Sequence, residues 1–443
     1  MTDGGRTGGP GPYEPGAAAR HQLVLHGWTD PAVVGLGIVA LAAGFGQFGL
    51  TATLGDVARH FGHVLHGSSI TDEAGLSGTQ LGLGLAIIRL ASLGGLPIAG
   101  LADRLGRRRI LLFACGIGLA VTAVSAASPG YWWFVVVFAI GRPFLSAAYA
   151  VAQVGAAEET GSTQRAAAVA LVAAGYAIGA GATAVIYGST GHALGYRGVF
   201  LLALVPMVAL PFVARWVSEP DRFLQAERSA ERRRPVLGAV AHPYRGRLVL
   251  VTSLVFSLGV ITGPANSFVF LYAQNVKRFP GYAESVMVIA AGILGFGGLL
   301  AGVRLADRIG RRPTAMGAMV CIGACGILCY SGSGPALVVG YLLGITAGGV
   351  IAPAAGAFVN ELFPTPVRAS VAGWNVAGAV LGAVTGLLLF GAVADAGSRF
   401  APAALVTFLP AMALSSLVWF LPETRGHEPE EFWPAAGGAE GGP

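Results

Sequence analysis

Apolar stretches of membrane-spanning length recur along almost the whole chain, and they constrain its fold more than any other feature. A helix needs roughly 20 apolar residues to cross the hydrocarbon core of a bilayer. Because lipid offers the backbone no hydrogen-bond partner, such stretches must be helical. We predict an all-α integral membrane protein whose twelve transmembrane helices lie at residues 32–56, 79–101, 110–128, 131–154, 166–187, 197–217, 248–274, 284–305, 313–332, 335–359, 369–394 and 401–421.

The composition excludes a soluble globular enzyme. Only 11% of the 443 residues are charged, whereas soluble domains carry roughly 25% charged residues. No glycine-rich phosphate loop of the form Gly-x-x-x-x-Gly-Lys-Ser/Thr occurs, which argues against ATP-driven transport. The four cysteines lie inside apolar stretches, where thiols behave as small hydrophobic groups. We therefore expect a monomer in a lipid bilayer with no cofactor, no metal and no nucleic-acid partner.

A polar, arginine-rich segment at residues 218–247 divides the apolar helices into two sets of six. The sequence thus predicts a six-helix bundle at 31–217, a cytoplasmic central loop at 218–247 and a second six-helix bundle at 248–421. Residues 1–30 are rich in Gly and Pro and are expected to be a disordered cytoplasmic tail. Residues 422–443 are expected to form a second cytoplasmic tail.

The distribution of basic residues predicts the orientation in the membrane. If both termini are cytoplasmic, 21 of the 28 Lys and Arg residues fall on the cytoplasmic side and five on the outer side. Cytoplasmic loops of membrane proteins carry this excess of positive charge. We predict a multi-pass protein of the cytoplasmic (inner) membrane with both termini inside.

Charged residues between the helices repeat at a nearly constant offset. Asp103-Arg104-x-Gly106-Arg107-Arg108 recurs 204 residues later as Asp307-Arg308-x-Gly310-Arg311-Arg312. Internal duplication of this kind is typical of secondary transporters. The remaining repeated pairs are Glu158 and Arg165 with Glu361 and Arg368, and Glu219 and Arg222 with Glu423 and Arg425.

These motifs resemble those of the major facilitator superfamily over residues 31–428, in its metabolite or sugar-porter-like branch. Glu361-Leu-Phe-Pro-Thr-Pro-Val-Arg368 is similar to the signature after the tenth helix, and Pro422-Glu-Thr-Arg-Gly426 to the motif after the twelfth. The leading glycine of the repeated loop motif is replaced by Ala99 and by Val303. The resemblance implies two pseudo-symmetric six-helix halves and transport of a small solute by alternating access.

The resemblance also implies that the repeated charges lock the cytoplasmic side of an outward-facing state. The alternative is that the arginines only fix the topology, although carboxylates contribute little to topology. The predicted gating residues of the first half are Asp103, Arg104, Gly106, Arg107, Arg108, Glu158, Arg165, Glu219 and Arg222. Those of the second half are Asp307, Arg308, Gly310, Arg311, Arg312, Glu361, Arg368, Glu423 and Arg425.

Two arginines lie inside predicted helices without an acidic residue at similar depth. Arg142 is 16 residues, or about 24 Å, from Glu158 at the helix end, and Arg89 is also near the middle of the membrane. Charges at this depth usually face a cavity or a partner. We interpret them as binding the carboxylate of a small organic anion, although Arg89 could equally be a structural residue. Further candidates for substrate binding are Gln47, Ser146, Tyr149, Gln153, Tyr176 and Asn266, and Thr183 and Tyr187 extend the polar face of the fifth helix.

The coupling ion and the transport direction stay open in the sequence. The resemblance would place an acidic proton carrier in the first helix, but Gln47 stands there and cannot titrate. Asp56, near the outer end of that helix, is the remaining candidate for proton symport, with facilitated diffusion as the alternative. A proton-coupled drug or metabolite efflux carrier, a sugar porter and a membrane sensor or enzyme are the competing functions.

Overall fold

The computed structural model describes residues 27–63, 74–161, 163–219, 244–397 and 399–433, and these ranges fold into helices joined by turns and short loops. Within them, twelve helical segments are long and apolar enough to cross a membrane, which confirms the predicted fold class. The helices of the first half are α1 (Pro31–Phe61), α3 (Gly78–Ala91), α4 (Gly95–Leu105), α5 (Arg107–Val124), α6 (Tyr131–Glu159), α7 (Arg165–Leu201) and α8 (Leu204–Val213).

The second half begins at Arg245 and repeats this arrangement. Its elements are α10 (Arg245–Ser267), α11 (Val269–Leu271), the π-helical turn η4 (Tyr272–Val276), α12 (Gly281–Arg308), α13 (Arg311–Cys329), α14 (Gly334–Glu361), α15 (Thr365–Gly397), α16 (Phe400–Ser415), and the 3-10 helices η5 (Ser416–Phe420) and η6 (Pro429–Phe432).

Several helices run further than the apolar stretches predict, mostly at their charged ends. The helix predicted at 131–154 continues to Glu159, and the one predicted at 284–305 continues to Arg308. Backbone hydrogen bonding continues through the interface while long charged side chains extend to water. The fifth and sixth helices are also merged, and the chain turns between them at Gly195, whose φ of 58° is in the left-handed region.

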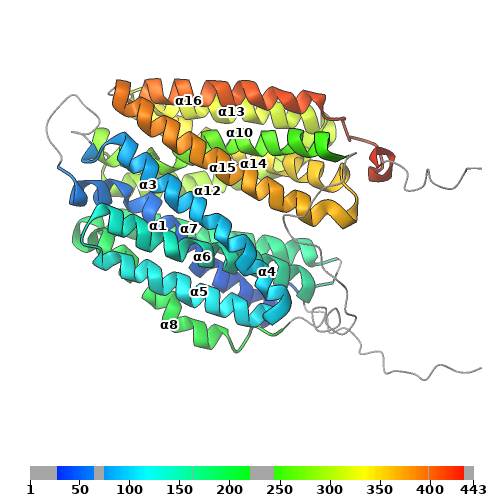
Figure 1. Cartoon of the computed structure of the whole chain (residues 1–443), viewed down its shortest axis with the longest axis horizontal. Coiled ribbons are helices and arrows are strands. Elements are labelled where there is room, and N and C mark those ends of the chain that lie inside the picture. The colour runs from blue at the N-terminus through cyan, green and yellow to red at the C-terminus, as the bar shows by residue number, and fades with distance from the viewer. Residues whose placement is uncertain (1–26, 64–73, 162, 220–243, 398, 434–443) are drawn as a thin grey trace, which may run out of the picture.

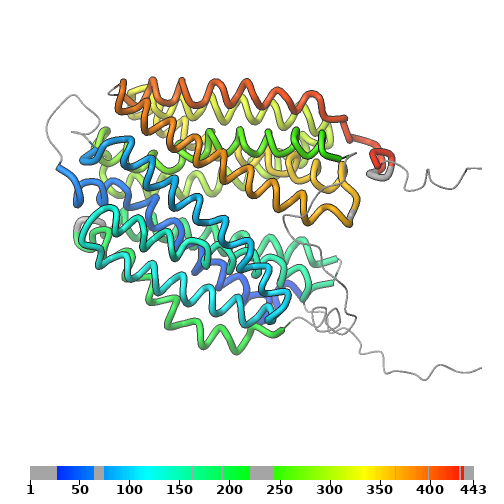
Figure 2. The backbone as a smooth tube through the Cα atoms, in the orientation of Figure 1, coloured from blue at the N-terminus to red at the C-terminus, as the bar shows by residue number. Residues whose placement is uncertain are grey.

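The helices form two bundles that lie side by side, α1–α8 and α10–α16 (Figures 1 and 2). Glycines allow the closest helix pairs to touch through their backbones. A Cβ on Gly44 of α1 would collide with the Tyr176 carbonyl of α7, and one on Gly382 of α15 would collide with the Phe256 carbonyl of α10. Small residues serve the same purpose in membrane helices generally.

The two halves are hydrogen-bonded to each other at one end of the molecule. We call the end with the α4–α5 and α12–α13 loops the arginine end, and the opposite one the far end. Figure 1 shows α3 beside α15 at the far end, where the Asp395 carboxylate accepts from the backbone N–H groups of Gly78 and Thr79, at 2.6 and 2.8 Å. Further far-end bonds run from Gln274 to Ala52 O, from Asn275 to Gly55 O and Ala74 O, and from Ser285 to Val185 O.

No hydrogen bond joins the halves at the arginine end within the described ranges. Among the described residues, the hydrogen bonds between the halves thus lie at the far end.

The predicted tails and central loop are partly outside the described ranges, which omit residues 1–26, 220–243 and 434–443. The described part of the C-terminal segment packs against the second bundle. Arg247 of α10 donates to the Phe432 carbonyl. The Trp433 indole N–H donates to the Glu361 carbonyl at 3.2 Å. These bonds hold residues up to 433 at the arginine end.

The close approach of α1 and α7 predicts that Gly44→Ala destabilises the protein. The added methyl group meets the Tyr176 carbonyl, and overpacking of this kind costs about 1–3 kcal/mol. The matched control is Gly292→Ala, because a Cβ on Gly292 meets no atom within 4 Å. We expect a lower apparent melting temperature in detergent for Gly44→Ala alone. Equal melting temperatures for the two variants would contradict the prediction.

Candidate functional site

Arg142 lies in the interior of the first bundle, where its guanidinium reaches across to α1. Its side chain is only 9% exposed, and its Nη1 donates to the Gln47 carbonyl at 3.0 Å. One turn further along α6, Leu145 fits against Gly46 of α1 and Gly118 of α5. This packing fixes the position of α6 and therefore of Arg142. The Nε of Arg142 is buried and has no hydrogen-bond partner among the described residues.

Arg89 of α3 provides a second positive charge near Arg142. It is half-buried, and it lies within electrostatic reach of both Arg142 and Tyr176. In the part of the chain that the structure describes, neither arginine forms an ion pair with a carboxylate. Two neighbouring cations without a counter-ion are unfavourable in a membrane.

Polar and aromatic side chains from three helices surround the arginines. The Tyr176 hydroxyl of α7 donates to Gln47 Oε1 at 3.4 Å, and Gln153 Nε2 of α6 donates to the Tyr149 hydroxyl at 2.8 Å. The rings of Tyr149 and Tyr176 lie 4.4 Å apart between centroids at an interplanar angle of 35°. The structure thus brings Gln47, Tyr149, Gln153 and Tyr176 together near Arg142.

The other polar residues of the two predicted faces are placed differently. Ser146 packs against Gly95 of α4, so it contributes to helix packing. Thr183 donates to the Phe45 carbonyl and ties α7 to α1, while Tyr187 is buried near the far end. Beyond Tyr176, Thr183 thus binds α1 and Tyr187 interacts with Arg59 at the far end, and a polar face that extends to these residues stays a prediction. Asn266 of α10 is partly buried and makes no side-chain hydrogen bond to the described residues.

The charged residues of the first half meet around Arg107 at the arginine end. Arg107 Nη2 lies 3.2 Å from Asp103 Oδ1 and 2.8 Å from Glu158 Oε1, so it joins α4, α5 and α6. Gly106 makes the turn between α4 and α5 with a φ of 100°. The Glu219 carboxylate accepts from the first backbone N–H groups of α5, at Arg107 and Arg108. A carboxylate at this position stabilises a helix N-terminus.

The second half repeats this geometry around Arg311. Arg311 lies 3.3 Å from Asp307 Oδ1 and 3.2 Å from Glu361 Oε1. Glu423 accepts from the backbone N–H groups of Arg311 and Arg312, at 2.8 and 3.0 Å. Gly310 makes the corresponding turn, with a φ of 110°.

Arg108 and Arg312 have a role that the sequence did not reveal. Arg108 donates to the carbonyls of Ala214 and Val217 at 2.7 Å, and Arg312 donates to those of Trp419 and Leu421. The C-terminal carbonyls of a helix lack intrahelical partners. These two arginines satisfy such carbonyls at the ends of the sixth and twelfth helices.

Several predicted members of the two charge networks make no ion pair in the described ranges. Arg104, Arg165 and Arg308 are exposed without a carboxylate partner. Arg368 donates to the Phe363 carbonyl at 2.8 Å and stacks over Trp433. Arg425 contacts Glu423 through its backbone N–H. In this conformation Arg368 therefore contacts backbone and an aromatic ring, while Arg104, Arg165 and Arg308 face solvent, so their membership of the networks stays a prediction. Arg222 lies outside the described residues.

Two carboxylates at the far end, Asp56 and Glu284, make contacts that the sequence did not predict. Asp56 accepts from the Tyr196 N–H at 2.6 Å and lies 3.7 Å from Arg59, so it stabilises the start of the sixth helix after Gly195. Glu284 of α12 is completely buried and accepts from Gln274 Nε2 at 2.8 Å. Sequence reasoning assigned Glu284 to a helix end and missed its burial, because the burial depends on tertiary contacts with several helices.

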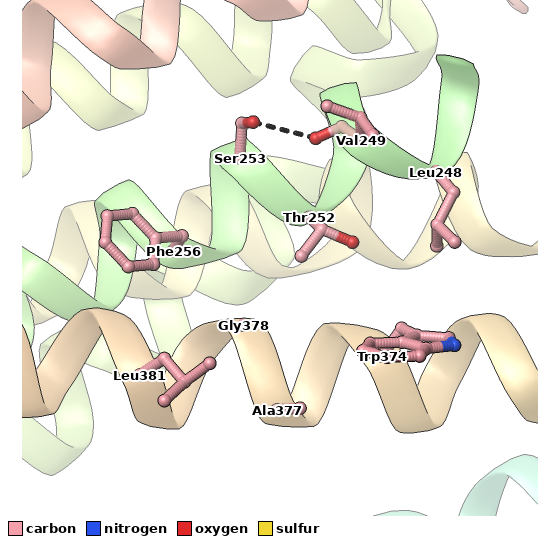
Figure 3. A pocket seen from close by; sticks show the side chains of 9 residues that line it. All are labelled: Leu248, Val249, Thr252, Ser253, Phe256, Trp374, Ala377, Gly378 and Leu381. Atoms are coloured by element: carbon pink, nitrogen blue, oxygen red, sulfur yellow. Dashed lines mark hydrogen bonds between the residues drawn. The ribbon is translucent and has the colours of Figure 1, made fainter. Parts of the chain in front are cut away.

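An apolar groove of about 360 Å³ lies between α10 and α15 (Figure 3). Phe256, Trp374 and Leu381 supply much of its surface. The Ser253 hydroxyl donates to the Val249 carbonyl in its own helix, at 2.7 Å. No charged side chain lines this groove, so it lacks the group that would hold an anion.

The sequence matches the profile of the Major Facilitator Superfamily over residues 36–303 and 295–437. A probable 4-methylmuconolactone transporter from Cupriavidus pinatubonensis is 28% identical over 373 residues, which cover 81% of this chain and 85% of that protein. A 3-(3-hydroxy-phenyl)propionate transporter from Escherichia coli is 29% identical over 308 residues, covering 67% and 73%.

Solved structures share the fold at lower sequence identity. The inward-open xylose transporter XylE from E. coli matches with a TM-score of 0.68 and 18% identity, over 90% of this chain and 98% of that one. The nucleoside transporter NupG matches with a TM-score of 0.68 and 14% identity, over 88% and 98%. The chain therefore belongs to the Major Facilitator Superfamily, and it is a multi-pass membrane transporter for a small solute rather than an enzyme.

Proposed function

We propose that the protein carries a small organic anion across the cytoplasmic membrane by alternating access, with the carboxylate held by Arg142. The observation that carries this proposal is the pair of neighbouring arginines, Arg89 and Arg142, without a carboxylate partner among the described residues. A substrate carboxylate would supply the missing charge. The unpartnered Nε of Arg142 leaves part of the guanidinium available for it.

The aromatic residues of the site suggest the remainder of the substrate. One relative transports 3-(3-hydroxy-phenyl)propionate, which by its name combines an aromatic ring with a carboxylate. Tyr149 and Tyr176 form a ring pair close to Arg142, and aromatic side chains favour ring contacts. A short aromatic or unsaturated carboxylate therefore fits both the charge and the surface of the site.

The positions of the charged clusters support a role in alternation. The excess of arginine at one end favours that end as cytoplasmic, with both termini inside. The hydrogen bonds that join the halves among the described residues lie at the opposite end, which supports a conformation that faces the cytoplasm. We infer that the two clusters around Arg107 and Arg311 hold each half rigid and meet when the cytoplasmic side closes.

Proton coupling through Asp56 has little support in the contacts. Both oxygens of that carboxylate are engaged, by the Tyr196 N–H and by Arg59. We infer that Asp56 is structural, so any coupled proton would have to bind at another group.

Replacement of Arg142 tests the binding proposal. We expect Arg142→Gln to lower the initial uptake of labelled 3-(3-hydroxyphenyl)propionate into proteoliposomes at least about tenfold, because a hydrogen bond to a charged group contributes about 1.5–3 kcal/mol. Arg142→Lys should restore only part of the uptake, since lysine lacks the planar fork of arginine. The control is Arg109→Gln, an exposed arginine of the α4–α5 loop region. Normal uptake by Arg142→Gln would refute the assignment.

Replacement of Arg107 tests the gating proposal separately from binding. We expect Arg107→Gln to slow uptake several-fold, because it breaks the contacts with Asp103 and Glu158. Substrate binding should persist and is measured as thermal stabilisation of the purified protein by the same probe. Arg104→Gln is the matched control, since Arg104 is exposed in the same motif. Equal uptake rates for the two variants would show that Arg107 has no role in gating.

A further inference from the structure

Glu284 stands apart from the other described carboxylates because it is completely removed from solvent. It lies in the first turn of α12 at the far end, with 0% exposure. Its Oε2 accepts one hydrogen bond, from Gln274 Nε2 at 2.8 Å. Its Oε1 is buried and has no hydrogen-bond partner among the described residues.

An ionised carboxylate in this setting is strongly unfavourable. One bond from a neutral amide does not replace the hydration that a carboxylate loses on burial. A buried charge is tolerated when a close counter-ion compensates it, but no cation lies within 4 Å of Glu284 in the described ranges. A neutral carboxyl group removes this cost, and its proton can satisfy Oε1.

The titratable groups around Glu284 come from three helices. Arg59 of α1 lies within electrostatic reach, yet it already pairs with Asp56. Tyr187 of α7 and Tyr341 of α14 are the other neighbours. Both tyrosines are uncharged near neutral pH, so they add no positive charge to balance an ionised Glu284.

The burial of Glu284 depends on the contact between the halves. Gln274, which binds Glu284, also donates to the Ala52 carbonyl of α1 at 3.1 Å. The adjacent Asn275 donates to the Gly55 and Ala74 carbonyls. Ser285, next to Glu284, donates to the Val185 carbonyl of α7. Opening of the far end would break these bonds and admit water to Glu284.

We propose that Glu284 is a proton-binding site of the transporter, which takes up a proton from the solution at the open far end and is buried in neutral form when that end closes. The inference rests on the alternating access of the proposed function, but not on the identity of the substrate. Proton binding and closure are linked, because each makes the other more favourable. Acidification on the far side therefore closes the far end.

The test measures the opening of the far end without any substrate. The probe is Ala74→Cys, a fully buried side chain at the far end, in full-length protein whose four native cysteines are replaced by alanine. A membrane-impermeant maleimide labels this thiol when the far end opens. Labelling of the exposed Ser189→Cys corrects for the pH dependence of thiol reactivity.

We expect the corrected labelling rate to fall at least about tenfold between about pH 8 and about pH 5.5. This change corresponds to a proton affinity about tenfold higher in the closed state than in the open state. In Glu284→Gln the rate should be low and independent of pH, because the amide keeps the buried shape without a charge. An unchanged pH dependence in Glu284→Gln would overturn the proposal.

Asp395→Asn is the control for a second far-end carboxylate. Asp395 accepts two backbone hydrogen bonds across the halves, so its protonation would weaken closure and give the opposite pH dependence. We expect Asp395→Asn to keep the response to acid. Loss of the response in Asp395→Asn, with retention in Glu284→Gln, would show that Glu284 is not the proton-binding group and would contradict the proposal.

Discussion

The cost of placing charge in a membrane determines where the ionised groups of this protein lie and what each of them contacts. At the arginine end, Glu158 and Glu361 bind arginines, and Glu219 binds the N–H groups at the start of α5. Within the bundle, Arg142 binds a backbone carbonyl. An ionised group without such a partner costs several kcal/mol. Because of that cost, the arginine pair supports a bound anion and the buried Glu284 supports a bound proton.

The fold was largely predictable from the sequence, because helix length and backbone hydrogen bonding in lipid leave few alternatives. The repeated charged motifs also indicated which loops would correspond. Helix ends were less predictable, since the helices continue through the interface, as α6 does to Glu159. The merged fifth and sixth helices depend on the single left-handed residue Gly195, which periodicity does not reveal.

For the candidate site, the sequence predicted the charged residues but not their contacts. The depth of Arg142 follows from counting residues, but its contact with the Gln47 carbonyl depends on the packing of Leu145 against glycines of two other helices. The contacts of Arg368 with the Phe363 carbonyl and the Trp433 ring could not be predicted, because a repeated position in the sequence does not fix which neighbour a long side chain meets. Glu284 was missed because its burial arises from tertiary contacts with helices of both halves.

The carboxylates Glu219 and Glu423 have a consequence for how the protein is made. Each comes from the end of a six-helix set and binds the start of the third helix in the same set. Each half can therefore provide a hydrogen-bond acceptor for the first N–H groups of its own third helix once its sixth helix has left the ribosome. The first bundle can acquire its native contacts at the arginine end before the second bundle is synthesised, and the duplicated sequence can be inserted into the membrane as two separate steps of assembly.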